Sequence, residues 1–247
     1  EDMWQTAIEM AKRCGGDRGA MGLMGPDTLP AAIKPNRLIV LETEGWLDVD
    51  PATKEAFAQL LGRLKAAGVT LIRRADHPFV EALEKAIANG RAVCNGVTSW
   101  ENRWYQRGML DAAPNGISAR GQATLRRAEA MTPDDYRTSL LARQQAQLAH
   151  TATASLADAA ITLSCPGPAP IWSGDVADQP LAPRPTGDFV FNAPSSMLFA
   201  PVVTVPLLNV GGMPVGVQLM GQQQEDSRVT GLARWFSENL KRVAVPA

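Results

Sequence analysis

"RLIVLET" (residues 37–43) and "VTLIR" (residues 69–73) flank a helical pattern, and this unit decides the fold class. Both runs are mostly apolar, as buried strands are. Between them, Asp50 and Pro51 predict a helix start, since aspartate caps the first free N–H groups and proline suits the first helical position. The apolar residues that follow have helical spacing: Phe57, Leu60, Leu61 and Leu64. Gly68 ends this helix. A strand, a helix and a strand in this order predict a parallel strand pair, and hence an α/β fold.

The last third of the sequence predicts a hairpin and a closing helix. Residues 159–164, "AAITLS", form an apolar run that we expect to be a buried strand. Strands are expected at 202–208 and 214–221, joined by a turn at 209–212. A helix is expected at about 226–241, with four residues facing inward: Val229, Leu232, Ala233 and Phe236.

The middle of the sequence is mostly helical. His77 and Pro78 open one helical segment, and Thr132 caps a longer helix that runs to about Leu156. This long helix passes through Tyr136, Leu140 and Leu148. We see no internal repeat, and we expect residues 1–247 to form a single α/β domain.

The composition excludes several classes of protein. The chain has 24 basic and 25 acidic residues and a net charge of -1, so it has no charge pattern for nucleic acid or for an anionic membrane. No apolar run approaches the roughly 18 residues of a membrane span. Cys14, Cys94 and Cys165 are widely spaced and odd in number, which indicates neither a disulfide framework nor a zinc site. We therefore expect a cytoplasmic protein with a small-molecule or protein partner.

Few residues suggest catalysis by themselves. His77 begins a helix and His150 lies on the polar side of the long helix, so we expect both to be surface or capping residues. A serine hydrolase using either histidine has no GxSxG motif to support it. Asp134 and Asp135 are adjacent carboxylates, but in the first helical turn they complement the helix dipole.

Cys165 follows a buried strand and precedes the proline-rich segment "CPGPAP", at the edge where α/β sheets bind ligands. A nucleophilic cysteine needs a base or an electropositive site, and the sequence offers none beside it. A small buried residue at the strand end is therefore the favoured interpretation. Trp172, in the following loop, either lines a pocket or closes the core.

Three segments together resemble the amidase signature family, the Ser-Ser-Lys amide hydrolases. They are "AAITLSCPGPAP", "GDFVFNAPSSMLFAPVVTVP" and "GGMPVGVQLMG", the last of which is similar to a G-x-P-x-G-x-Q-x-x-G hairpin. The order of these segments matches the family, and the resemblance spans essentially the whole chain, most loosely between residues 37 and 156. It implies an α/β fold with a mixed sheet flanked by helices.

The resemblance also implies where the chemistry lies. In this family a serine attacks the amide, activated through a second serine that relays its proton to a lysine, near a segment of the G-G-S-S-G-G-S kind. No such segment occurs here. The catalytic residues are thus expected upstream of Glu1, so this chain supplies none of them and requires no metal or organic cofactor. The chain has no initiator Met and starts on a helical pattern, which favours a cut through a longer protein.

The segment "FNAPSSM" matches the family's substrate-facing helix start. The candidate substrate-binding residues are Trp172, Asp188, Phe191, Asn192 and Ser195. Ser195 and its neighbour Ser196 are not the signature serines, and the alternative is that both only cap the helix.

The functional hypothesis is the carboxy-terminal half of an amidase, acting on a small-molecule amide through an acyl-serine intermediate. Its partner would be the missing amino-terminal half, and it would expose an unpaired sheet edge or an apolar helix face. A homo-oligomer is compatible with such a surface. The alternatives are a catalytically inactive binding or assembly subunit, and a hydrolase that uses Cys165 or Ser195 with a histidine.

Overall fold

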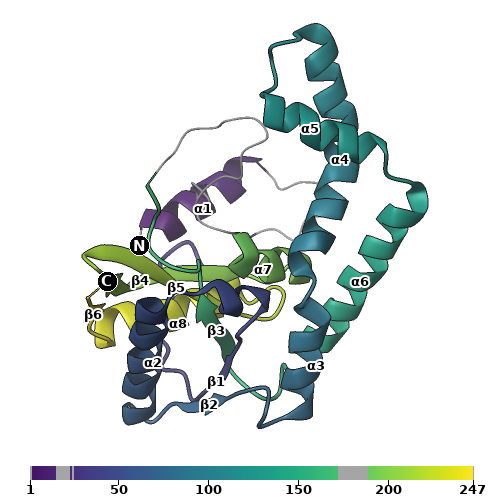
Figure 1. Ribbon diagram of the computed structural model, residues 1–247. Helices are drawn as coiled ribbons and strands as arrows, with labels where there is room; N and C mark the ends of the chain where they lie inside the picture. The colour runs from purple at the N-terminus through teal and green to yellow at the C-terminus, as the bar shows by residue number, and fades with distance from the viewer. Residues whose placement is uncertain (1, 15–22, 24, 172–188, 247) are drawn as a thin grey trace.

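The computed structural model describes residues 2–14, 23, 25–171 and 189–246. Within them, six strands form one mixed sheet in the order β2-β1-β3-β5-β4-β6 (Figure 1). The strands are β1 (Arg37–Val40), β2 (Thr70–Ile72), β3 (Ala159–Leu163), β4 (Val202–Val210), β5 (Met213–Met220) and β6 (Val243–Val245). β1 is parallel to β2 and β3, β5 is antiparallel to β3 and β4, and β6 is parallel to β4. The expected mixed α/β sheet is confirmed.

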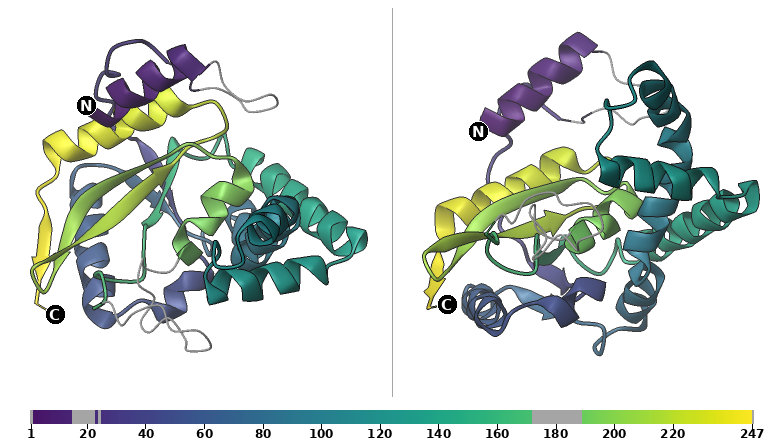
Figure 2. Two further views of the ribbon diagram at one scale, coloured as in Figure 1. Left: turned by 90° about the horizontal axis from the view of Figure 1, so that it is seen from above. Right: turned by 45° about the horizontal axis from the view of Figure 1, so that its top comes forward.

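Helices flank the sheet. They are α1 (Asp2–Cys14), α2 (Pro51–Ala66), α3 (Pro78–Ile87), α4 (Gly90–Ala112), α5 (Ala119–Glu129), α6 (Pro133–Thr151), α7 (Ala193–Leu198) and α8 (Asp226–Asn239), with short 3-10 turns η1 (Glu44–Asp48) and η2 (Phe189–Phe191). α2 and α8 pack their apolar residues against one face of the sheet. α3, α6 and α7 contribute to a second cluster on the opposite face. Figure 2 shows α4, α5 and α6 together on this second side.

The unit β1–α2–β2 forms as the sequence predicts. Asp50 caps α2 by accepting a hydrogen bond from the Thr53 backbone N–H at 2.9 Å, and Pro51 is the first helical residue. The four apolar residues at helical spacing are all buried. After α2 ends, Gly68 adopts a φ of 86°, a left-handed conformation that glycine tolerates best, and the chain turns into β2.

The β4–β5 hairpin and α8 also agree with the sequence. Gly211 and Gly212 make the turn with φ values of 58° and 85°, which glycine tolerates without steric cost. Val229, Leu232, Ala233 and Phe236 of α8 are buried as expected. The sequence did not predict β6, which pairs only three residues with β4.

The long helix α6 differs from expectation in two ways. It ends at Thr151 rather than near Leu156. His150 is not a surface residue but is only 3% exposed, so the expectation that it lies on a polar face was wrong. The reason is the phase of the helix: Ala146 and His150, one turn apart, form the buried face, whereas Leu148 is 59% exposed.

Among the described residues, no helix is both long and apolar enough to cross a membrane.

Candidate substrate-binding site

The short helix α7 is held in place by side chains from several distant segments. The Cys94 thiol of α4 donates a hydrogen bond to the carbonyl of Ala193 at 3.3 Å. Gln147 of α6 and Gln223, which follows β5, donate from Nε2 to the carbonyls of the last two helical residues at 3.2 and 3.0 Å. A helix of six residues is not stable alone, so these contacts and its buried apolar side chains fix its position.

The serine pair lies at the start of α7. Ser195 Oγ donates to the carbonyl of Asn192 at 2.8 Å, and Asn192 Nδ2 donates to the carbonyl of Ser164 at 3.3 Å. Within the described chain, no side chain accepts a capping hydrogen bond from the first N–H groups of α7. The capping interpretation of the two serines is therefore not what the structure shows. Ser196 is exposed and lines the pocket described below.

Gln218 ties this segment to the centre of the sheet. Its side chain is fully buried on β5, and its Nε2 donates to the carbonyls of Leu163, at 2.9 Å, and Phe191. Its Oε1 has no hydrogen-bond partner among the described residues. The glutamine was visible in the sequence as part of "GVQLMG", but its role in joining β3, η2 and β5 depends on contacts that are distant in sequence.

A pocket of about 480 Å³ lies between α4, α6 and α7. Its walls combine apolar and polar side chains: Val93, Cys94, Asn95, Val97, Thr98, Glu101, Arg143, Phe189, Ser196, Met197 and Phe199. Of the predicted substrate-binding residues that the structure describes, none lines this pocket: Phe191, Asn192 and Ser195 are absent from its walls, and α7 contributes Ser196 and Met197 instead. The walls from α4 and α6 were not predicted. Only their helical pattern was detectable, with no signal that they face α7.

Arg143 is the one basic residue among the described residues that line this pocket. Its guanidinium lies 4.8 Å from the centre of the Phe199 ring, and no ion pair joins it to another described residue. Burial raises the pKa of the Cys94 thiol, and the nearby charge of Arg143 opposes that rise. Tyr136 donates to Glu101 Oε1 at 2.7 Å, and this hydrogen bond raises the pKa of the tyrosine hydroxyl.

The predicted residues are placed as follows. Asn192 and Ser195 lie together at the start of α7, whereas the Phe191 side chain is fully buried in the core beside Gly45. Trp172 and Asp188 lie outside the described residues. Contact of these five residues with a substrate stays a prediction.

The other candidates do not form a catalytic set. The Cys165 thiol donates to the carbonyl of Gly167 at 3.2 Å. His77 caps α3 as expected, its ring accepting a hydrogen bond from the Phe79 N–H. Within the described chain, no hydrogen bond joins either histidine to Cys165 or Ser195. The same residues contain no group of three or more side chains able to hold a metal ion.

The arrangement is a mixed sheet flanked by helices, with a pocket beside a short proline-containing helix, and solved amidases share this fold. One structure described as an amidase superposes with a TM-score of 0.70 at 23% identity, over 86% of this chain and 47% of that one. A 6-aminohexanoate cyclic dimer hydrolase superposes with a TM-score of 0.61 at 15% identity, over 92% of this chain and 50% of that one. A glutamyl-tRNA(Gln) amidotransferase subunit from Thermotoga maritima superposes with a TM-score of 0.51 at 18% identity, over 89% of this chain and 45% of that one.

The family itself is identified from the sequence of residues 27–230, which match the model of the family named Amidase. This chain belongs to the amidase family, as the resemblance in three segments had implied. It spans about half the length of the solved structures that it matches. Comparison with curated proteins finds no match.

Proposed function

We propose that this chain is the carboxy-terminal half of an amidase-signature hydrolase, with residues 1–247 belonging to its single α/β domain. The whole protein would cleave a carbon–nitrogen amide bond through an acyl-serine intermediate. The observation that carries the proposal is the family match over residues 27–230, combined with coverage of about half of each solved relative. Without the Gly/Ser-rich signature, this chain would supply part of the substrate pocket and no nucleophile.

The geometry at Ser195 supports a role other than nucleophile for this residue. A serine becomes nucleophilic when a base accepts its proton. The Ser195 hydroxyl instead donates to the Asn192 carbonyl, which cannot remove that proton. The role we propose for α7 is to form one wall of the site, so that the substrate is oriented against a nucleophile from the other half.

Exposed apolar side chains support a partner surface. On α4, Trp104 is 74% exposed and Tyr105 is 72% exposed. The amino-terminal half of the same protein is the proposed partner, and a cytoplasmic location remains part of the proposal. A small-molecule amide would be the substrate.

Amide hydrolysis and labelling with a fluorophosphonate probe test the proposal. The assay compares this chain with a version extended upstream in its native reading frame. We expect turnover and serine labelling only in the extended protein. Labelling of Ser195 or Ser196 in this chain alone would contradict the proposed division of roles.

The second candidate is a catalytically inactive binding or assembly subunit with an amidase-like fold. It is favoured by one observation, that a component of an amidotransferase is among the structures sharing the fold. An extended protein that contains the Gly/Ser signature and hydrolyses an amide would exclude this candidate. A reading frame that starts beside Glu1 would favour it.

A further inference from the structure

Arg143 is a cation without an ion-pair partner in the described chain, and it lines a pocket with largely apolar walls. An arginine held beside apolar surface loses part of its hydration, and this loss is unfavourable unless another group compensates for it. The Phe199 ring below the guanidinium supplies one cation–π contact. The N–H groups of the planar Arg143 guanidinium can still donate two parallel hydrogen bonds to a carboxylate.

Phe199 provides a second, independent observation. It ends α7 with φ 52° and ψ 35°, in the left-handed region that disfavours residues other than glycine. The residue is nevertheless 57% exposed, so little burial offsets that strain. Strained backbone at a pocket is typical of functional positions, since the surrounding structure must maintain it. The strained conformation presents the aromatic ring to the pocket beneath Arg143.

The charges and walls of the pocket limit the class of ligand. Arg143 is the one basic residue among the described residues that line it, and Glu101 is the one acidic residue. The Glu101 carboxylate already accepts a hydrogen bond from Tyr136. A single cation with an acidic residue nearby suits a monoanion better than a doubly charged phosphate. The side chains of Val93, Val97 and Met197 would contact an apolar chain or ring.

We infer that this pocket binds the carboxylate of an amide substrate that also carries an apolar chain or ring, with Arg143 contacting the carboxylate and Phe199 the apolar part. The inference rests on the proposed amide hydrolysis, because it names the substrate class of that site. Arg143 would then be a specificity-determining residue and not a member of the catalytic set.

Binding of two small probes to this chain tests the inference. Phenylacetate carries a ring and a carboxylate, and phenylacetamide is its uncharged counterpart of similar shape. By isothermal titration calorimetry, we expect phenylacetate to bind at least tenfold more tightly than phenylacetamide. Arg143→Gln should remove this difference. Phenylacetate should also slow alkylation of Cys94 by iodoacetamide, followed peptide by peptide with mass spectrometry, without slowing that of Cys165.

Two further variants keep the test independent of folding. Arg137→Gln changes an exposed arginine of the same helix and should leave both affinities unchanged. Phe199→Gly relieves the left-handed strain, so its melting temperature should not fall, while phenylacetate affinity should fall about threefold or more. Equal affinities for the two probes, no binding of phenylacetate, or unchanged affinity in Arg143→Gln would each overturn the inference.

The failure of this inference is distinguishable from failure of the proposed function. Probe binding needs no turnover, whereas the hydrolysis assay needs no carboxylate. Hydrolysis by the extended protein without Arg143-dependent binding would overturn only the assignment of substrate class. Arg143-dependent binding without hydrolysis or serine labelling would overturn the proposed activity, and the pocket would then be a carboxylate site of a binding subunit.

Discussion

At the scale of single residues, His150 illustrates how a titratable side chain can serve structure alone. Its side chain is buried at the end of α6, and its carbonyl accepts hydrogen bonds from Thr153 Oγ1 at 2.7 Å and Gln222 Nε2 at 3.0 Å. Burial lowers the pKa of its imidazole from 6.5 to about 4. The neutral form is therefore the native form at neutral pH.

This burial predicts a pH dependence of stability. Between about pH 4 and pH 6.5 the unfolded chain binds a proton at His150 that the native chain does not. The stability that the chain has with His150 buried and neutral is therefore fully present above pH 6.5, and it is lost as the pH falls toward 4. His150→Gln should remove about 3 kcal/mol of the pH-dependent change in unfolding free energy across this window, measured by urea denaturation at several pH values.

The control is Gln145→Ala, which changes an exposed and non-titratable residue of the same helix and should leave the pH dependence of the parent chain in place. A His150→Gln variant whose pH profile parallels that of the parent chain would show that His150 is protonated in the native state near its ordinary pKa.

At the scale of elements, the glycines of β5 and α2 have opposite roles. A methyl group on Gly216 would lie 2.4 Å from Ser164 Oγ and 2.5 Å from Thr204 Cγ2, so this position allows β3, β5 and β4 to approach closely. A methyl group on Gly62, within α2, would meet nothing within 4 Å.

These environments predict stability changes of opposite sign. Gly216→Ala should lower the unfolding free energy by about 1–3 kcal/mol, because the added methyl group overpacks the sheet. Gly62→Ala should raise it by about 0.5–1 kcal/mol, because alanine favours the helix and reduces the entropy of the unfolded chain. Chemical denaturation of both variants side by side tests the pair, and a stabilised Gly216→Ala variant would contradict the packing argument.

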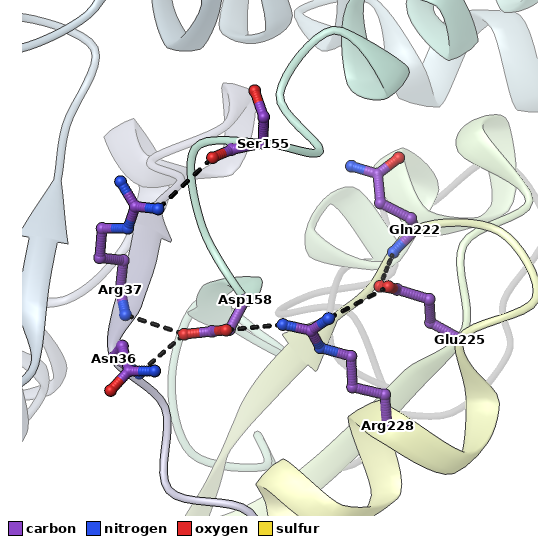
Figure 3. A network of polar contacts seen from close by, with 7 residues as sticks. All are labelled: Asn36, Arg37, Ser155, Asp158, Gln222, Glu225 and Arg228. Atoms are coloured by element: carbon purple, nitrogen blue, oxygen red, sulfur yellow. Dashed lines mark hydrogen bonds and ion pairs between the residues drawn. The ribbon is translucent and has the colours of Figure 1, made fainter.

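At the scale of the whole molecule, Asp158 joins three segments that are far apart in sequence (Figure 3). It accepts hydrogen bonds from the backbone N–H groups of Asn36 and Arg37 at 2.7 and 2.9 Å, and it pairs with Arg228 of α8 at 2.6 Å. Because it precedes β3 and binds the start of β1, it supports the parallel register of the two strands. Burial raises the pKa of Asp158, but these three contacts outweigh that effect and hold it below its usual value.

Asp158→Asn should lower the unfolding free energy by about 2–3 kcal/mol at pH 7, because the charged acceptor is lost from a half-buried network. Because the pKa of Asp158 is lower in the native chain, its contribution to the unfolding free energy is fully present above the unfolded pKa of about 3.9. It is lost as the pH falls through the native pKa of Asp158. Thermal and urea unfolding at pH 7 measure the change.

Asp48→Asn, an exposed aspartate at the end of η1, serves as the control and should change stability by less than about 0.5 kcal/mol. Equal effects of the two substitutions would mean that the Asp158 network contributes no more than an ordinary surface charge.

The sequence by itself predicted the β1–α2–β2 unit, β3, the β4–β5 hairpin and α8. In each case the signal is local: a capping residue, an apolar period or a glycine turn lies within the element that it specifies. The family also followed from the sequence, because its motifs are short segments whose order along the chain carries the information.

The tertiary structure alone decided the burial of His150, the addition of β6 and the composition of the pocket. Cys94, which lines the pocket, and Ala193, to which it donates a hydrogen bond, are 99 positions apart, and Arg143 comes from a third element. A helical period predicts that a helix has a buried face. It does not predict which distant helix will cover that face or which polar side chain will be buried there. Local sequence therefore determined the elements of this protein, whereas long-range packing determined the site between them.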